Sequence, residues 1–440
     1  MSEAAPTLDK PVATGRVVAS ASMWLLLVIY ILNFLDRQVV NILAEPIKQD
    51  LGLDDRQLGM LTGLSFALFY TVLGIPIARL AERANRVWII SGATALWSLF
   101  TVASGFAANF TQLLLARVGV GVGEAGCSPP AHSLITDYAP REQRASALAF
   151  YSLGIPLGSL LGLALGGLVA DAYGWRTAFF VAGAPGLLVA AVALVVLKEP
   201  RRAAPATAAR VETPSLGQAL KELATKPSFW LISVGASLGA FVSYGQIAFF
   251  GSFYARNHGT ELAGLASGFG LGVAGFLGTT LGLIIGISGG LGTFAGGRLA
   301  DAWTRRNRGA YADTSALGVA LAFPLAAAAF LVPSGVASLA LLAIPVFLNN
   351  AWYGPVFASV QSLAQPRTRA TAAAIMLFIV NLIGLGLGPL VLGDISTRLT
   401  PEFGEAQAVR WAMIATGAAG LIGGLLFWLA GRRLGREMVG

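Results

Sequence analysis

The 440-residue chain has little charge, because only 12% of its residues are Asp, Glu, Lys or Arg whereas 55% are hydrophobic. Its mean hydropathy is +0.70. In a typical soluble domain about a quarter of all residues are charged, so this composition excludes an ordinary soluble protein. Repeated apolar runs of about 20 residues favour membrane-spanning helices over a barrel of alternating ten-residue strands. The sequence therefore predicts an all-α membrane protein.

Cysteine and histidine are almost absent from the chain. It contains one cysteine, Cys127, and two histidines, His132 and His258. A single cysteine excludes an intrachain disulfide and a cysteine-rich metal site. Phosphate-loop, HExxH and paired-cysteine motifs are lacking, which argues against ATP-driven and zinc chemistry. We predict no enzymatic activity, no metal site and no cofactor.

The apolar runs and the breaks between them predict twelve spans. These run over 20–44, 57–78, 87–107, 112–135, 145–170, 176–197, 229–254, 273–296, 314–332, 337–362, 371–394 and 409–430. The glycine-rich run 263–297 is too long for one straight span, which indicates a break or a short extra helix.

The net charge of +8 could suggest nucleic acid, but the basic residues collect on one side. With twelve spans, the termini and the even-to-odd loops hold 22 of the 30 Lys and Arg residues, the other loops hold six, and Arg37 and Arg117 lie within spans. Basic loops face the cytoplasm. Both termini are therefore predicted to be cytoplasmic, and the membrane to be a bacterial inner (plasma) membrane.

The longest hydrophilic stretch divides the chain into two halves. We expect an N-terminal tail, a six-helix bundle, a cytoplasmic linker, a second six-helix bundle and a C-terminal tail, over 1–19, 20–197, 198–228, 229–430 and 431–440. Charged residues at the start of the linker, among them Lys198 and Glu199, are interpreted as solvated anchors at the membrane surface.

Short motifs recur at matching places in the two halves. RLAE at 79–82 follows the second span and RLAD at 298–301 follows the eighth. PREQRASA at 140–147 precedes the fifth span and PRTRATA at 366–372 precedes the eleventh. Same-topology repeats with a midplane site between them are typical of secondary transporters.

Four charges remain within the spans: Asp36 and Arg37 on the first, Arg117 and Glu124 on the fourth. A charge in a span costs about 3 kcal/mol even on lenient scales, so it usually faces a partner or water. Arg117 and Glu124 share a helix face, and Asp36 lies level with the gap between them. Arg37 points about 100° away from Asp36. We expect an ion pair between Asp36 and Arg117, with Arg37 directed elsewhere.

The two carboxylates are predicted to lie in different surroundings, Glu124 in a glycine-lined helix and Asp36 beside an arginine. Such a contrast favours a proton switch. Protonation of Asp36 would then free Arg117 for an anionic ligand. The alternative is a static salt bridge that joins two helices.

The second half has no charge in its spans but many polar and aromatic side chains. Candidates to line a central cavity are Tyr244, Gln246, Asn349, Asn350, Tyr353 and Asn381. A cavity that is charged on one wall and aromatic on the other suits an amphiphile.

Several motifs resemble those of a known family. ARLAERANR at 78–86 and GRLAD at 297–301 resemble the loop signature of the major facilitator superfamily. LNFLDR at 32–37, ARVGVGVGEAG at 116–126, SLGIPLGSLLG at 152–162 and LKEP at 197–200 resemble its spinster branch. The resemblance implies two six-helix bundles, a central cavity, alternating access and proton coupling, with lysophospholipids or sphingosine phosphate as the substrates of relatives.

The resemblance also implies roles for individual residues. Asp36 and Glu124 would be proton-coupling sites, and Arg117 and Arg37 would contact the substrate or act as charge partners. A cytoplasmic gate would be formed by Glu82, Arg83, Arg86, Asp301, Arg141 and Arg144.

We expect a proton-driven transporter of an anionic, lysolipid-like amphiphile, acting as a monomer among membrane lipids and without a nucleic-acid partner. Two alternatives remain. One is an organic-anion or drug/proton carrier of the same fold, and the other is a non-transporting membrane sensor.

Overall fold

The computed structural model of the protein describes residues 20–140, 143–200 and 216–439, and every regular element within these ranges is helical. The first half contains α2 (Ala21–Ile42), α3 (Ala44–Leu51), α4 (Asp55–Gly59), η1 (Met60–Leu64), α5 (Ser65–Arg83), α6 (Arg86–Ser104), α7 (Phe110–Glu124), α8 (Ser128–Tyr138), α9 (Arg144–Ser152), α10 (Gly154–Tyr173) and α11 (Trp175–Val196). The second half contains α12 (Leu216–Ala224), α13 (Pro227–Gly268), α14 (Val273–Leu283), η4 (Ile284–Ser288), α15 (Gly289–Thr304), α16 (Ala310–Leu331), α17 (Gly335–Asn350), α18 (Tyr353–Leu363), α19 (Arg369–Val380), η5 (Asn381–Leu387), α20 (Gly388–Gly417) and α21 (Ala419–Glu437). The η elements are π-helical turns.

Ten segments of the described residues are helical, long and apolar enough to span a membrane. The last, Arg369–Glu437, is interrupted at Gly404, whose φ of 72° favours glycine, and therefore makes two crossings. Helices α7 and α8, with 15 and 11 residues, together make one more. The resulting twelve crossings, six in each half, confirm the predicted all-α membrane fold.

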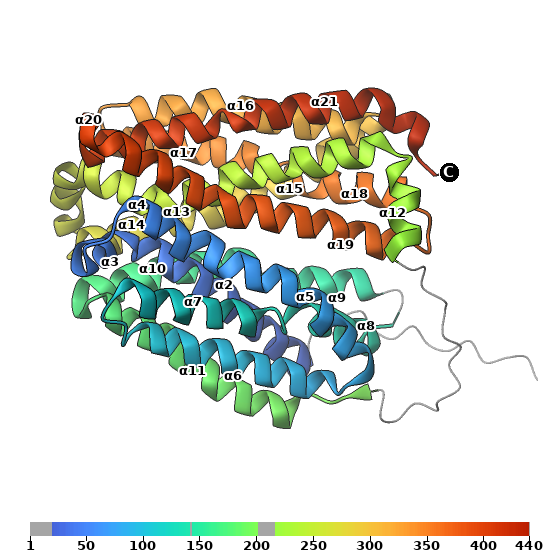
Figure 1. Ribbon diagram of the computed structural model, residues 1–440, viewed down its shortest axis with the longest axis horizontal. Coiled ribbons are helices and arrows are strands. Elements are labelled where there is room, and N and C mark those ends of the chain that lie inside the picture. Colours follow the sequence, from blue (N-terminus) through green and yellow to red (C-terminus); the bar gives the residue numbers. More distant parts are fainter. Residues whose placement is uncertain (1–19, 141–142, 201–215, 440) are drawn as a thin grey trace, which may run out of the picture.

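Figure 1 shows the two halves side by side, with most helices running along the longest axis. Helices α8 and α12 and the last residues lie at one end, here called the linker end. Helices α3 and α4 lie at the other, here called the sealed end, where α10 packs against α14 and α4 against α20. Toward the linker end the ribbons of α5 and α19 separate (Figure 1).

Two crossings break at corresponding places. Helix α7 ends at Glu124, just before Pro129 and Pro130, and α17 ends at Asn350, just before Pro355. Proline lacks the N–H group that would continue a helix. The repeated motifs that start at 140 and 366 lie equally far beyond the two breaks. Asn350 therefore holds in the second half the place that Glu124 holds in the first.

The glycine-rich run 263–297 contains the predicted break. Helix α13 continues to Gly268, well beyond the predicted end of the seventh span at 254, and the chain then turns at Gly270 with a φ of 69°. The π-helical turn η4 lies further along the same run.

The predicted linker is partly helical and attached to the second half. The Glu222 carboxylate of α12 accepts hydrogen bonds from the Gln365 N–H and the Thr368 hydroxyl, both at 2.9 Å. Lys226 Nζ donates to the carbonyls of Leu363 and Glu437. The N-terminal tail and residues 201–215 of the linker lie outside the described residues.

Candidate functional site

The four charges of the spans gather inside the first half. Glu124 is fully buried where α7 breaks, and Arg37 Nε donates to its Oε2 at 2.6 Å. The Arg37 guanidinium also lies 4.9, 4.8 and 4.5 Å from the ring centres of Phe34, Phe66 and Tyr70. Its side chain is 13% exposed, whereas that of Glu124 is 0% exposed. The arginine therefore separates the carboxylate from accessible space, held by an ion pair and by cation–π contacts.

The predicted ion pair between Asp36 and Arg117 is wrong. Asp36 is buried, and the Thr101 hydroxyl of α6 donates to its Oδ2 at 2.5 Å. Arg117 is 1% exposed, and its Nε and Nη1 have no hydrogen-bond partner among the described residues. The position of each residue along its span predicts that Asp36 and Arg117 lie at a similar depth. It does not predict the direction in which each side chain points from its helix. Arg37, directed elsewhere as predicted, is the arginine that forms the ion pair.

Aromatic side chains of the second half face this cluster. Tyr244 of α13 packs against the buried core of the first half, which includes Phe66, and also against that of the second half. Tyr353 stacks on Trp352 at the break between α17 and α18, with ring centres 4.0 Å apart. Asn381 begins η5 and is partly exposed. The charges thus lie beside an aromatic junction between the halves.

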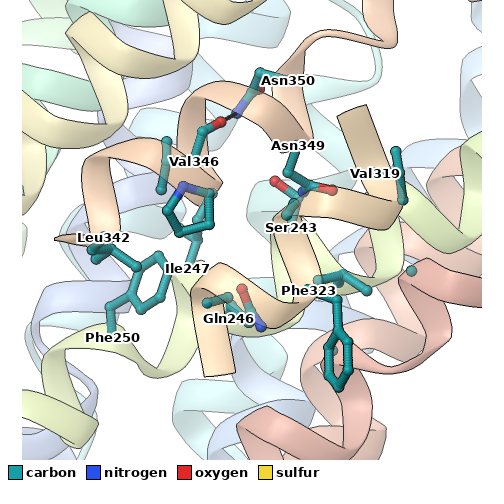
Figure 2. Close-up of a pocket in the computed structure, with 16 residues that line it drawn as sticks. Ser243, Gln246, Ile247, Phe250, Val319, Phe323, Leu342, Val346, Asn349 and Asn350 are labelled. Carbon is teal, nitrogen blue, oxygen red and sulfur yellow. Dashed lines mark hydrogen bonds between the residues drawn. The ribbon is translucent and has the colours of Figure 1, made fainter. Parts of the chain in front are cut away.

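Three of the predicted cavity residues, Gln246, Asn349 and Asn350, line a pocket within the second half. Figure 2 shows the two asparagine amides above Gln246 and the rings of Phe250 and Phe323. Asn350 Nδ2 donates to the Val346 carbonyl at 2.7 Å, whereas Asn349 Oδ1 is buried without a hydrogen-bond partner among the described residues. The lining is otherwise mostly apolar: Val242, Ile247, Val319, Ala322, Ala326, Leu342, Pro345 and Val346. Its cavity volume is about 30 Å³, so the pocket can receive a small hydrogen-bond donor beside Asn349.

Charged residues join the halves at the sealed end. Arg256 of α13 donates from Nη1 and Nη2 to the two carboxylate oxygens of Asp55, each at 2.8 Å. It also reaches Glu45 at 2.7 Å, and Lys48 reaches Glu405 across the halves at 2.9 Å. Sequence reasoning missed this network because Arg256 lies just beyond the predicted seventh span and was counted as a loop residue. The acids Glu45 and Asp55, close together in one loop, were the signal available.

The helix backbones also touch at the sealed end. A Cβ atom on Gly393 would lie 2.1 Å from the Asp55 carbonyl oxygen, and one on Gly278 would lie 2.2 Å from that of Leu163. Only glycine permits so close an approach. The two halves are therefore in direct main-chain contact at this end.

Arg86, a predicted gate residue, is fully buried within the first half. Its Nη1 lies 2.6 Å from Asp137 Oδ2, its N–H donates to Glu199 Oε2 at 2.8 Å, and Glu199 also accepts from its guanidinium. The interpretation of Glu199 as a solvated anchor is wrong, since its side chain is only 6% exposed. A buried guanidinium needs such partners, because an unpaired buried charge is strongly destabilising.

The other predicted gate residues lie at the linker end. Glu82 and Arg83 are exposed at the end of α5. Asp301 accepts a hydrogen bond from the Tyr311 hydroxyl at 3.0 Å, and Arg144 Nε donates to the Thr136 carbonyl at 3.0 Å. Each of these two contacts joins residues of the same half, the first in the second half and the second in the first half. Arg141 lies outside the described residues, and the closing of a gate by this set stays a prediction.

Comparison with known proteins places the chain in a family. The sequence model of the Major Facilitator Superfamily matches residues 26–389. An MFS-type efflux pump of Mycolicibacterium smegmatis is 32% identical over 437 residues, covering 99% of this chain and 98% of that protein. Protein spinster homolog 1 of Homo sapiens is 30% identical over 420 residues, covering 91% of this chain and 78% of that protein.

A solved structure is similar over the same length. The crystal structure of a bacterial homolog of the human lysosomal transporter Spinster, in an inward-facing and unoccupied conformation, matches with a TM-score of 0.83 and 34% identity, covering 95% of this chain and 98% of that one. Transport, and not enzymatic catalysis, is the function of this group. The chain belongs to the spinster branch of the major facilitator superfamily and is a multi-pass membrane transporter.

Proposed function

We propose that the protein couples proton movement to the transport of an anionic, lysolipid-like amphiphile across a bacterial plasma membrane by alternating access. The buried ion pair between Arg37 and Glu124 carries the proposal. It places an ionisable carboxylate and a potential anion-binding guanidinium in direct contact beside the junction of the two halves.

The charge distribution supports an orientation. The linker end belongs to the side that holds 22 of the 30 Lys and Arg residues, so we assign it to the cytoplasm. The halves are packed together at the other end, and the similar bacterial spinster homolog was solved facing inward. We therefore infer that this conformation faces inward, with the linker end toward the cytoplasm.

The ion pair suggests how a proton and an anion would be linked. A proton on Glu124 removes the negative charge that holds Arg37, so the guanidinium can then bind an anionic headgroup. Loss of the proton restores the ion pair and releases the anion. Asp36, whose Oδ2 accepts a hydrogen bond from the Thr101 hydroxyl, is the second candidate proton site. In this scheme Arg37 binds the headgroup, in place of the Arg117 expected from the sequence.

The surroundings of Arg37 fit an amphiphile. Phe34, Phe66 and Tyr70 surround the guanidinium, and Tyr244 extends the aromatic surface into the second half. A single acyl chain would continue past Tyr244 toward the apolar side of the second half.

Reconstituted vesicles test the proposal. A pH gradient across the membrane should drive uptake of a fluorescent lysophospholipid by the wild type, and Glu124→Gln should reduce it to background. Glu402→Gln, which removes a carboxylate that is exposed, is the matched control and should leave uptake unchanged. Full proton-driven uptake by both Glu124→Gln and Asp36→Asn would refute proton coupling at these sites.

A drug or organic-anion carrier is the second candidate. The 32% identity to a mycobacterial efflux pump over 99% of the chain favours it. Binding of lysolipids, sphingoid phosphates and small organic acids to the purified protein distinguishes the two. Tighter binding of a hydrophilic acid than of any single-chain lipid would support the second candidate. Membership of a transporter family argues against a non-transporting sensor.

A further inference from the structure

The two halves treat one repeated arginine in opposite ways. Asn85 accepts a hydrogen bond from the Val87 N–H and Asn307 accepts one from the Gly309 N–H, each at the turn after a repeated RLA motif. The residue after the first asparagine, Arg86, is buried between Asp137 and Glu199. The residue after the second, Arg308, is exposed and has no ion pair within the described part of the chain.

In the first half, Glu199 follows the last crossing and pairs with Arg86. At the corresponding place in the second half, near Arg308, the chain has arginines. The last crossing ends with Arg432, Arg433 and Arg436, and a Cβ atom on Gly435 of the same turn would lie 2.8 Å from Arg308 Cβ. All of these arginines are exposed, as are the neighbouring residues 305 and 306. The corner therefore carries six arginines that have no acidic partner among the described residues.

The acids near this corner already have other partners, and Asp301, one helical turn before Arg305, accepts a hydrogen bond from the Tyr311 hydroxyl at 3.0 Å. Asp313 accepts from Asn307 Nδ2 at 2.6 Å and so holds the turn in place. Glu437 accepts from the Ser228 N–H at 2.9 Å at the start of α13. The excess positive charge is thus left to an anion from outside the chain.

A groove runs from the arginines along α16 and α21. It is lined by Trp303, Asp313, Ala316, Leu317, Ala320, Gly424, Leu425 and Trp428. Leu317 and Leu425 are about half exposed, and the Arg432 guanidinium lies over the Trp428 ring with Cζ 3.8 Å from its centre. Tryptophan beside arginine is typical of the interface between headgroups and acyl chains.

We propose that an anionic phospholipid of the membrane occupies this groove as a bound, structural lipid. Its phosphate lies among Arg308, Arg432 and their neighbours, in the role that the Glu199 carboxylate has in the first half. One acyl chain follows the groove between Leu317 and Leu425. Guanidinium groups bind phosphate by paired charge-assisted hydrogen bonds, and basic pockets between spanning helices are known sites for anionic headgroups.

Native mass spectrometry of the purified full chain tests the site. After exchange into detergent with equal amounts of phosphatidylglycerol and phosphatidylcholine, the wild type should retain phosphatidylglycerol in preference. The double variant Arg308→Gln/Arg432→Gln should retain at least about tenfold less, since two charge-assisted contacts are lost. The control Arg367→Gln/Arg369→Gln removes two exposed arginines of the same end and should behave as the wild type.

A second variant tests the groove without changing the charge. Leu425→Trp fills the acyl channel at an exposed position, so it should lower retention of phosphatidylglycerol while the melting temperature without lipid stays at the wild-type value. Equal retention of the two lipids by the wild type, equal loss in both double variants, or full retention by Leu425→Trp would each overturn the proposal.

Discussion

The broken crossing of the first half and that of the second have the same backbone design but different chemistry. At the first break Glu124 is buried and paired with Arg37 of another helix. At the second, Asn350 donates to the Val346 carbonyl of its own helix, beside an apolar pocket. The comparison teaches that the two halves share equivalent interruptions at mid-crossing but use them differently. The first interruption holds a buried ion pair, and the second lies beside a small, mostly apolar pocket.

The largest expected effect comes from removing the charge at the first break only. Glu124→Gln should abolish proton-driven uptake, whereas Asn350→Leu should retain its proton dependence and change mainly the apparent affinity for the amphiphile. Uptake by reconstituted vesicles with and without a pH gradient measures both. An equal loss of the proton response in the two variants would show that the halves do not divide the work in this way.

The repeated arginines give the next largest effect. Arg86→Gln removes a fully buried guanidinium that contacts the carboxylates of Asp137 and Glu199, and it should destabilise the first half by about 3–5 kcal/mol. Arg308→Gln removes an exposed charge and should change stability by less than about 0.5 kcal/mol. Thermal unfolding in one lipid-free detergent compares the variants. A similar loss for both would contradict the difference in burial between the halves.

The network at the sealed end sharpens the comparison, since its acids Glu45 and Asp55 come from the first half and Arg256 from the second. Arg256→Gln should increase the population that is open at this end. Spin labels on Gln49→Cys and Glu402→Cys should report a longer distance between the halves. Arg398→Gln, which breaks an exposed pair within the second half, is the control. An unchanged distance would mean that main-chain contacts alone close this end.

The smallest effect is expected in the pocket of the second half. Asn349→Leu removes a buried acceptor without a hydrogen-bond partner in the described structure, together with a long hydrogen bond of 3.5 Å from Nδ2 to the Gly239 carbonyl. The two losses oppose each other, so the free energy of unfolding should change by less than about 1 kcal/mol. Affinity for a lysolipid that donates a hydrogen bond should fall a few-fold, by about 1 kcal/mol. Affinity for a lysolipid without a donor should not change, and a loss for both would indicate altered packing.

The sequence was sufficient for the helical architecture, because the length of an apolar run is a property of the chain itself. The orientation inferred from the basic loops stays a prediction. The sequence also identified all four charges inside the spans. It did not predict which of them pair, since Asp36 and Arg37 leave α2 in directions that only packing against α6 and α7 determines. Glu199 and Arg256 were missed for one shared reason. Both lie at the boundary of a span, where a charged residue is interpreted as solvated unless its partner is known.

The π-helical turns have a consequence for movement. Gly63 in η1 and Gly386 in η5 lie against each other across the halves, where a Cβ atom on Gly63 would be 3.0 Å from the Gly386 oxygen. A π-turn accommodates one extra residue in a helix. If the π-turn moves along the helix, the residues that it passes rotate by about 100° about the helix axis, while the two ends of the helix stay helical. Two π-turns, η1 and η5, meet at this contact. Side chains there can therefore be reoriented by rotation within single helices, without translation of a whole helix.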